Sequence, residues 1–322
     1  MRILYCDYKM SPSADNFVAG LKAQIPDCEV ECWKYTDDNT LIKKLEGVQG
    51  LLTANLRVGD HVLSNADSLR VISVDATGYG NINIESAKKN NILVCSMGAY
   101  CTEEVADHTM LLTLMLEKNI KAQIRNVDEK RIYDYKLCPP PDRIKGKNMV
   151  IFGYGRIGKC VAERAQAFGY NLYAVPHDKS RIGASEGSVR FIDKDMACAV
   201  ADVLVNNMSE NPETFEYFGR DMFERLIRKP ILINVGRGSA VNETDLMHAL
   251  KSGKLRGAGL DVVKEVYPDL DQSPFIGMDN VIITPHMAFY SKKSIASIKT
   301  LPVNNLVNGL EGKLNKISCI AE

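Results

Sequence analysis

One segment restricts the possible folds of this chain more than any other, because it sets a strand, a tight turn and a helix in succession. The apolar run 149–152 leads into Gly153, Gly155 and Gly158, which have a G-x-G-x-x-G spacing. A helical pattern then covers residues 159–168, and another apolar run follows. Two parallel strands need a crossover connection, usually a helix, so this segment predicts a βαβ unit.

Each glycine of the turn has a physical reason to be there. The first permits the tight turn, the second lets phosphates approach the backbone, and the third lets the helix pack close to the strand. Free N–H groups at the start of the helix, with roughly half a positive charge, then face the anion. Because the motif stands between a strand and a helix, it favours dinucleotide binding over a glycine-rich turn without a ligand. The candidate cofactor residues here are Gly153, Tyr154, Gly155, Arg156, Ile157 and Gly158.

Length and composition are those of a globular protein. The 322 residues suffice for two domains, with 45% hydrophobic and 25% charged residues. The formal net charge is +0 and no basic tract stands out, so nucleic acid and anionic membranes are poor candidate partners. No apolar run approaches the roughly 18 residues of a membrane span. The start of the chain has no signal-peptide layout, so we expect a cytoplasmic protein.

The cysteine pattern indicates neither a metal site nor a redox dithiol. The nine cysteines are scattered and include no C-x-x-C pair. Cys28 and Cys32 have a ligand-like separation, but no second pair of Cys or His follows nearby. We therefore expect reduced, buried thiols and no bound metal.

The first hundred residues alternate short apolar runs with helical stretches. Helical spacing covers residues 15–23, 39–45 and 84–90. The apolar runs predict strands at residues 2–6, 28–33, 50–53, 71–75 and 92–95. This alternation predicts a parallel, doubly wound sheet that is covered on both faces.

The rest of the chain repeats this alternation. We expect a long helix over residues 102–124, then a break at the proline-rich residues 138–142. Further strands are predicted at residues 149–152, 171–175, 203–206, 231–235, 257–262 and 281–284. The final helical pattern, residues 294–309, is interrupted by Pro302.

These patterns predict an α/β fold with two doubly wound parallel-sheet domains. A Rossmann dinucleotide-binding domain is expected at residues 101–287. It would be inserted into a flavodoxin-like substrate domain that is formed by residues 1–100 and 288–322.

Candidate catalytic residues follow three of the predicted strands. Arg237 stands between two glycines, and its guanidinium offers a rigid fork to a carboxylate. Glu265 follows the next strand, and His286 stands just past the last one. Taken alone, each is more often a structural or surface residue. Because ligands of open parallel sheets bind outside the carboxyl ends of the strands, the three together form a candidate catalytic group.

Motifs along almost the whole chain resemble one enzyme family. They are GYGRIG at residues 153–158, NVGRG at 234–238, GLDV at 259–262, TPH at 284–286 and ATGYGNI at 76–82. With these motifs, the chain resembles the D-isomer-specific 2-hydroxyacid dehydrogenases. The residues Tyr290 and Ser291 after Phe289 resemble those at the same place in the branch of the family that contains the C-terminal-binding-protein corepressors.

The resemblance implies hydride transfer between a nicotinamide cofactor and C2 of a 2-oxo or 2-hydroxy acid. It makes His286 the proton donor and acceptor, Glu265 its partner, and Arg237 the group that binds the substrate carboxylate. Backbone N–H groups of Thr77 and Gly78 would hold the same carboxylate. A substrate contact is also implied for Tyr100, and cofactor contacts for Val235 and Asp261.

One departure from the family pattern concerns the partner of the histidine. Glu265 lies four residues after Asp261, whereas the family places its glutamate five residues after, where this chain has Val266. Either the loop is one residue shorter and Glu265 still reaches His286, which we favour, or the partner is missing. The alternative acids are Asp269 and Asp271.

A second departure concerns the cofactor. An NAD enzyme usually ends its second strand with an acid that binds the ribose hydroxyls. Here Pro176 and His177 stand at the strand end, and Asp178 comes two positions late. Without an acid at the tip, a 2′-phosphate is less strongly repelled, and His177, Lys179 and Arg181 could attract it. We favour NAD(H), with Asp178 as the ribose contact, and NADP(H) is the alternative.

The leading hypothesis is a D-2-hydroxyacid dehydrogenase, active as a homodimer by resemblance. Its substrate is expected to carry an apolar or aromatic side chain, because the presumed pocket includes Tyr79, Tyr100, Met287 and Phe289. A NAD(H)-sensing, corepressor-like binding protein is the alternative, although the chain lacks extended tails for recruiting partners. Formate or phosphite oxidation is a third interpretation. The remaining histidines in helical patterns, namely His61, His108 and His248, are interpreted as packing or solvated positions.

Overall fold

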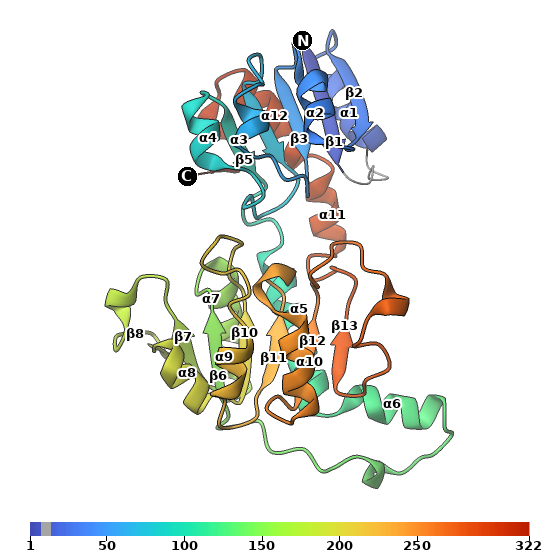
Figure 1. Cartoon of the computed structure of the whole chain (residues 1–322), viewed down its shortest axis with the longest axis vertical. Helices are drawn as coiled ribbons and strands as arrows, with labels where there is room; N and C mark the ends of the chain where they lie inside the picture. Colours follow the sequence, from blue (N-terminus) through green and yellow to red (C-terminus); the bar gives the residue numbers. More distant parts are fainter. Residues whose placement is uncertain (8–13, 322) are drawn as a thin grey trace. The chain divides into compact units, whose positions relative to one another are not determined.

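The computed structural model describes residues 1–7 and 14–321, and the chain divides into two compact units. Unit 1 comprises Met1–Cys101 and Ser291–Glu322, and unit 2 comprises Thr102–Tyr290. Unit 2 is therefore an insertion into the sequence of unit 1. Each unit has a mainly parallel sheet with helices on both faces, so the predicted α/β fold class is confirmed (Figure 1).

The sheet of unit 1 has the flavodoxin-like strand order. Its strands are β1 (Arg2–Asp7), β2 (Glu29–Lys34), β3 (Gly50–Thr53), β4 (Val71–Val74), β5 (Leu93–Ser96) and β14 (Cys319–Ile320). They are arranged as β14-β5-β4-β3-β1-β2, and only β14 pairs in the antiparallel direction. The order 2-1-3-4-5 places the ends of β1 and β3 next to each other, where the chain order reverses.

The helices of unit 1 cover both faces of this sheet. They are α1 (Ala14–Gln24), α2 (Asp38–Leu45), α3 (Asp60–Leu63), α4 (Ile84–Lys89), α11 (Lys292–Ile298) and α12 (Leu301–Leu310). Apolar side chains of α2, α3 and α4 pack on one face, and those of α1 and α12 pack on the other. Pro302 lies in the first turn of α12, where its missing N–H costs nothing, so the expected single helix is two helices.

Unit 2 contains the classical dinucleotide-binding strand order with additions at both edges. Its strands are β6 (Asn148–Phe152), β7 (Asn171–Val175), β8 (Ser185–Glu186), β9 (Val189–Phe191), β10 (Val203–Asn206), β11 (Ile231–Asn234), β12 (Gly257–Leu260) and β13 (Val281–Ile283). The order is β13-β12-β11-β10-β6-β7-β9-β8, with β8 antiparallel. The order reverses between β6 and β10, which makes this the switch point where ligands of such sheets bind.

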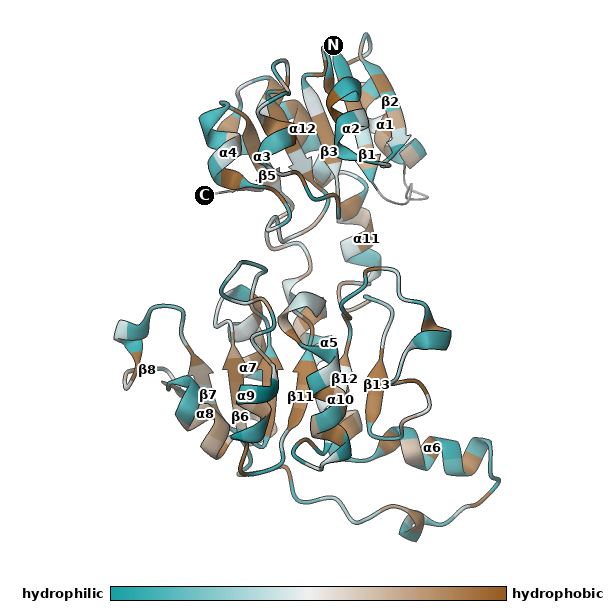
Figure 2. Ribbon diagram, viewed as in Figure 1, coloured by the Kyte–Doolittle hydropathy of each residue, from teal (hydrophilic) through white to brown (hydrophobic). Residues whose placement is uncertain are grey.

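The helices of unit 2 lie on both faces of its sheet. They are α5 (Thr102–Glu117), α6 (Ile120–Asp128), α7 (Arg156–Ala167), α8 (Lys194–Val200), α9 (Arg220–Glu224) and α10 (Glu243–Lys251). Helices α8, α9 and α10 pack on one face, while α5 packs with α7 and with β11–β13. Figure 2 shows hydrophobic colour concentrated on strands such as β11 and β13.

The single helix expected over residues 102–124 was wrong. Asn119 adopts a left-handed backbone with φ +53°, which ends α5 and starts α6 in a new direction. Asparagine tolerates this conformation better than most residues, so the break is encoded locally. No helix of the described residues is both long and apolar enough to cross a membrane.

Candidate active site

The glycine turn after β6 is required by the chain's own packing at two positions. Gly153 has φ +87°, and a Cβ there would lie 2.7 Å from the backbone carbonyl carbon of Asn207. A Cβ on Gly158 would lie 2.3 Å from the carbonyl oxygen of Gly153. Both distances are far too short for real contacts. The turn therefore holds β6, α7 and the loop after β10 together.

Gly155 differs, because a Cβ there would meet no atom within 4 Å. It is the N-cap of α7, and no side chain caps the helix at this end in the described part of the chain. The first N–H groups of α7 are thus left for water or a ligand. Arg156 and Ile157 form the first turn of the helix, and Tyr154 packs against Phe191 with ring centroids 5.5 Å apart. This open cradle fits the phosphates of a dinucleotide.

Asn207 provides a second indication that a ligand is bound at the switch point. Its backbone N–H donates to the carbonyl oxygen of Phe152 over 2.8 Å, which places it at the end of β6. Its Nδ2 and Oδ1 are buried, and neither has a hydrogen-bond partner among the described residues. Because buried polar groups are nearly always paired, a polar ligand or a water is expected to complete this amide.

The end of β7 carries both cationic and acidic side chains, and some of them form ion pairs. The Nε2 of His177 lies 3.8 Å from Glu213 Oε2 on an exposed surface. The Oδ1 of Asp178 accepts the N–H of Ser180 over 2.9 Å, and hydrogen bonding from the side chain and then the backbone of Ser180 lowers the pKa of the carboxyl. The guanidinium of Arg181 donates to the carboxylate of Glu186.

Two buried asparagines shape the loops that follow β10 and β11. Asn206 Nδ2 donates to Asn234 Oδ1 over 2.9 Å, and Asn234 Nδ2 donates to the carbonyl oxygen of Arg237 over 3.0 Å. A Cβ on Gly238 would lie 1.9 Å from the carbonyl oxygen of Val263, so this position also requires glycine. The backbone on both sides of Arg237 is thereby fixed at the carboxyl edge of the sheet.

Asp261 organises the turn that presents His286. The carboxylate is buried and accepts three hydrogen bonds, from Thr284 Oγ1 at 2.6 Å, Met287 N at 2.9 Å and Ala288 N at 2.9 Å. The N–H of His286 donates to the carbonyl oxygens of Asp261 and Thr284, at 3.0 and 2.9 Å. His286 has φ +52°, a conformation that side-chain-bearing residues seldom adopt. The carboxylate thus holds a strained turn in place.

The imidazole of His286 lies at the exposed surface of unit 2 and is affected by two charges. Partial dehydration among the loop residues lowers its pKa, the guanidinium of Arg237 lowers it further, and the carboxylate of Asp261 opposes both. The side chain of Arg237 is partly exposed, and its Nη1 donates to the carbonyl oxygen of Gly236 over 2.9 Å. The candidate arginine and histidine thus both follow strands at the carboxyl edge of this sheet, and the charge of the arginine disfavours protonation of the histidine.

Glu265 does not join this group in the structure. The residue is exposed, and no hydrogen bond or ion pair between it and His286 occurs in the described chain. Of the two fallback acids, Asp269 is engaged locally, because its Oδ1 accepts the backbone N–H of Asp271 over 3.1 Å. The pairing of Glu265 with His286 stays a prediction.

The candidate residues of unit 1 lie at the carboxyl edge of its own sheet. Thr77 and Gly78 belong to the loop after β4, and Thr77 Oγ1 lies 3.6 Å from Cys101 Sγ. Tyr100 is half-buried just before the end of this segment. Their contacts to a substrate stay predictions.

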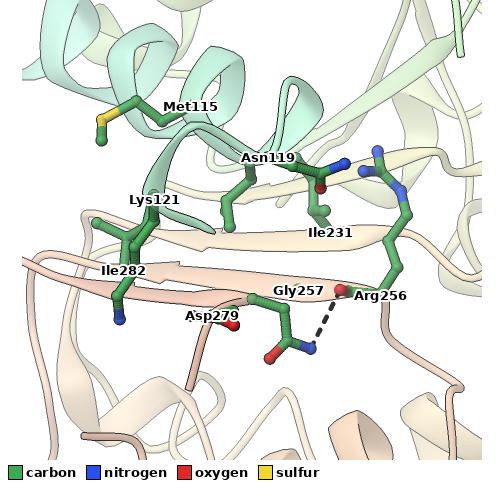
Figure 3. A pocket seen from close by; sticks show the side chains of 10 residues that line it. Met115, Asn119, Lys121, Ile231, Arg256, Gly257, Asp279 and Ile282 are labelled. Carbon is green, nitrogen blue, oxygen red and sulfur yellow. Dashed lines mark hydrogen bonds between the residues drawn. The ribbon is translucent and has the colours of Figure 1, made fainter. Parts of the chain in front are cut away.

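A small cavity at the opposite, amino-terminal edge of the unit 2 sheet is not a cofactor site (Figure 3). Its volume is about 60 Å³, whereas ligand pockets usually need at least 300 Å³. Its cations already have partners. Lys121 Nζ donates to the carbonyl oxygens of Met278 and Val281, and Arg256 Nη2 donates to the buried carboxylate of Glu117.

Two doubly wound units, a dinucleotide turn, and an arginine and a histidine at one edge define the class of a nicotinamide-dependent oxidoreductase. A sequence profile described as "D-isomer specific 2-hydroxyacid dehydrogenase, NAD binding domain" matches residues 110–288. The chain belongs to the D-isomer-specific 2-hydroxyacid dehydrogenase family, and it is an NAD(P)-dependent enzyme that acts on 2-hydroxy acids.

Relatives and solved structures agree with this assignment. The chain is 30% identical over 285 residues to a hydroxypyruvate reductase of Blautia hydrogenotrophica, covering 86% of this chain and 87% of the relative. A D-lactate dehydrogenase from Aquifex aeolicus, complexed with NAD and lactic acid, has a TM-score of 0.84 at 24% identity and covers 99% and 98% of the two chains. An acyclic imino acid reductase in complex with NADPH and D-Arg also has a TM-score of 0.84, at 23% identity and full coverage of both chains. These two structures show the shared fold.

The sequence alone missed several residues of the site. The paired asparagines of β10 and β11, the unpartnered Asn207, and the contact of His108 with Thr284 were not expected. Asparagines that end apolar runs give a usable signal, because an amide after a buried strand must find partners. The role of His108 gave no local signal, because its partner is distant in sequence.

Proposed function

We propose that this protein reduces a 2-oxo acid to the D-2-hydroxy acid, and catalyses the reverse reaction, with His286 as proton donor and Arg237 as carboxylate anchor. The observation that carries the proposal is that Arg237 and His286 follow strands at one edge of the same sheet, where the guanidinium, after dehydration, lowers the pKa of the imidazole. Both stand at the edge of the sheet that holds the dinucleotide turn.

The two side chains divide the work on the substrate. When bound, the nicotinamide supplies a hydride to C2 or accepts one from it. Arg237 presents a planar fork to the substrate carboxylate and draws electron density from the adjacent carbonyl. The imidazolium of His286 donates a proton to the carbonyl oxygen during reduction, and the neutral ring accepts it during oxidation.

The protonation of His286 is expected to make kcat/KM depend on pH in opposite ways for reduction and oxidation. Reduction needs the protonated ring, and the pKa of His286 is lowered from its ordinary value by dehydration and by Arg237. We therefore expect kcat/KM for reduction to fall as pH rises through this pKa, and kcat/KM for oxidation to fall as pH drops through it. Parallel profiles in both directions would contradict the assignment of His286.

We propose NAD(H) as the preferred cofactor. Two of the residues at the end of β7 that could attract a 2′-phosphate have acidic neighbours, Glu213 for His177 and Glu186 for Arg181. Asp178 Oδ1 accepts the N–H of Ser180 at this strand end, and we propose its carboxylate as the contact of the ribose hydroxyls. The phosphates would lie on the Gly155 cradle, and Val235 and Asp261 are proposed contacts of the nicotinamide end.

We propose that the substrate carries an apolar side chain. The turn that presents His286 also exposes Met287, with 38% of its surface accessible, and sets Phe289 edge-on to the imidazole with centroids 6.3 Å apart. These apolar neighbours favour a branched or aromatic group on C3 over a charged one.

We also propose a homodimer. Helix α6 and the loop after it extend away from the sheet of unit 2 (Figure 1). This arm exposes Ile124, Tyr133 and Tyr135, at 51%, 96% and 77% of their surfaces. Exposed aromatic and aliphatic side chains on a protruding arm are typical of an interface between copies. Sedimentation velocity would measure the mass directly, and a monomer at micromolar concentration would contradict the proposal.

A steady-state assay tests the function. The purified protein is mixed with NADH or NADPH and with pyruvate, hydroxypyruvate, glyoxylate, 2-oxoisocaproate or phenylpyruvate. We expect turnover with NADH and the highest kcat/KM for the two larger apolar acids. Highest activity with hydroxypyruvate or glyoxylate would overturn the proposed side-chain preference but not the enzyme. Tight cofactor binding with no turnover of any acid would favour the NAD(H)-sensing alternative, which the named relatives do not favour.

A further inference from the structure

Of the five histidines, His108 alone is buried, with 8% of its surface exposed. It lies on α5, far in sequence from the turn at residues 284–288, and its Nε2 is 3.0 Å from Thr284 Oγ1. The proposed function gives this residue no role. Within residues 1–7 and 14–321, the charged group that acts on it is the Asp261 carboxylate, whose Oδ1 lies 3.5 Å from the same nitrogen.

The geometry points to His108 as a positioning residue for the proton transfer by His286. It acts through Thr284, by holding the Asp261 carboxylate against the turn that presents His286. This inference rests on the proposed role of His286.

The direction of the hydrogen bonds can be deduced from the number of protons. Thr284 Oγ1 donates its single hydroxyl proton to Asp261 Oδ1 over 2.6 Å. The hydroxyl oxygen can then only accept from His108, so the Nε2 of His108 carries the proton. The order His108 to Thr284 to Asp261 is therefore a chain of donors that ends on a carboxylate.

The Asp261 carboxylate, held by Thr284, in turn fixes the backbone of the turn that presents His286. Its other acceptor positions receive the N–H groups of Met287 and Ala288, which directly follow His286. The left-handed backbone of His286, with φ +52°, is strained and persists only because its neighbours are fixed. Removing the donor at His108 frees the hydroxyl of Thr284 and then the carboxylate to turn.

The charge of Asp261 matters as well as its position. The groups that act on the His286 ring are Arg237, which disfavours the imidazolium, and Asp261, which favours it. Burial lowers the pKa of His108, so its ring stays neutral near pH 7 and leaves the charge of Asp261 uncompensated. Asp261 is thus an acid that supports the protonated His286 from within the turn itself.

The test compares His108→Leu with His108→Gln, because the glutamine amide can donate from nearly the same place as Nε2. For reduction, we expect His108→Leu to move the fall of kcat/KM toward lower pH by about one unit, and to lower kcat about tenfold at pH 7.5. His108→Gln should restore most of both. Binding of NADH, followed by its fluorescence, should stay near the wild-type value in both variants. The control is His248→Leu, an exposed position on α10.

Two results would overturn the inference: a pH profile unchanged in His108→Leu, or a His108→Gln variant as impaired as His108→Leu. If His108→Leu does not fold, Thr284→Val removes the same chain of donors and Thr284→Ser retains it. We then expect Thr284→Val to behave like His108→Leu, and Thr284→Ser to behave like His108→Gln. The proposed function fails separately, because it predicts loss of turnover in His286→Asn whatever the His108 variants do.

Discussion

The carboxyl-terminal edges of the two sheets both gather polar side chains, but they satisfy them differently. In unit 2, Asn206, Asn234 and Asp261 are buried, and each has at least two hydrogen-bond partners. In unit 1, Thr53 Oγ1 and Asp75 Oδ1 are buried with no partner among the described residues. At the unit 2 edge, the side-chain amide of Asn207, beside the dinucleotide turn, is the buried group that has no hydrogen-bond partner among the described residues.

This difference indicates which sheet edge is rigid enough to carry a catalytic group. A fully paired polar network is rigid, and rigidity is what a proton donor and a carboxylate anchor need. An unpaired buried carboxyl instead makes local stability depend on protonation. Burial, and secondarily the charge of Asp7, raises the pKa of Asp75 well above its ordinary value. Unit 2 is therefore expected to carry the reaction, and unit 1 to carry the stronger pH dependence of stability.

The largest expected effect is at the paired edge. Replacing His286 with asparagine removes the proton donor, while asparagine tolerates the left-handed backbone at this position. We expect kcat to fall by about 10²–10⁴-fold, with NADH binding nearly unchanged. Steady-state kinetics and a fluorescence titration check both halves. A fall in kcat smaller than about tenfold would contradict the assignment of the reaction to the unit 2 edge.

Two glycines of the same turn separate folding from binding. Gly158→Ala places a methyl group 2.3 Å from a backbone oxygen, so we expect a loss of about 3 kcal/mol of unfolding free energy. Gly155→Ala meets no atom within 4 Å and should leave the melting temperature unchanged, but weaken NADH about tenfold or more by filling the cradle. Thermal denaturation and NADH titration measure the pair. Normal NADH binding by Gly155→Ala would contradict the prediction that the phosphates of the cofactor lie on the Gly155 cradle.

The smallest expected effect is at the unpaired edge. Because the folded pKa of Asp75 is raised, its contribution to stability is present at low pH and is lost as pH rises from the unfolded value of about 3.9 through the folded one. Asp75→Asn mimics the neutral carboxyl, so we expect about 1–2 kcal/mol higher stability at pH 7 and a flatter pH profile. The control is the exposed Asp67→Asn. Lower stability of Asp75→Asn at pH 7 would show that the carboxyl has a partner in solution.

Most of the fold could be predicted from the sequence, because buried parallel strands appear as short apolar runs bounded by helical patterns. Two expected helices were each broken, at Asn119 and before Pro302, by residues whose backbone preference outweighs the periodicity. The short strands β8, β9 and β14 were not expected, since two or three residues give no periodic signal.

The candidate site was predictable only where its signal was local. Gly153 and Gly158 stand in a motif whose steric need is set by neighbouring backbone. The contact between His108 and Thr284 joins residues 176 positions apart, so no local pattern encodes it. The exposed position of Glu265 likewise depends on how its loop folds.

The most direct test of the central claim follows a single hydrogen atom. The protein is incubated with NADH deuterated on C4 of the ring and with 2-oxoisocaproate, and the product is analysed by chiral chromatography and mass spectrometry. We expect a D-2-hydroxy acid with one deuterium at C2, and no product from His286→Asn above about one hundredth of the wild-type rate. Unreacted cofactor, or an L-product, would contradict it.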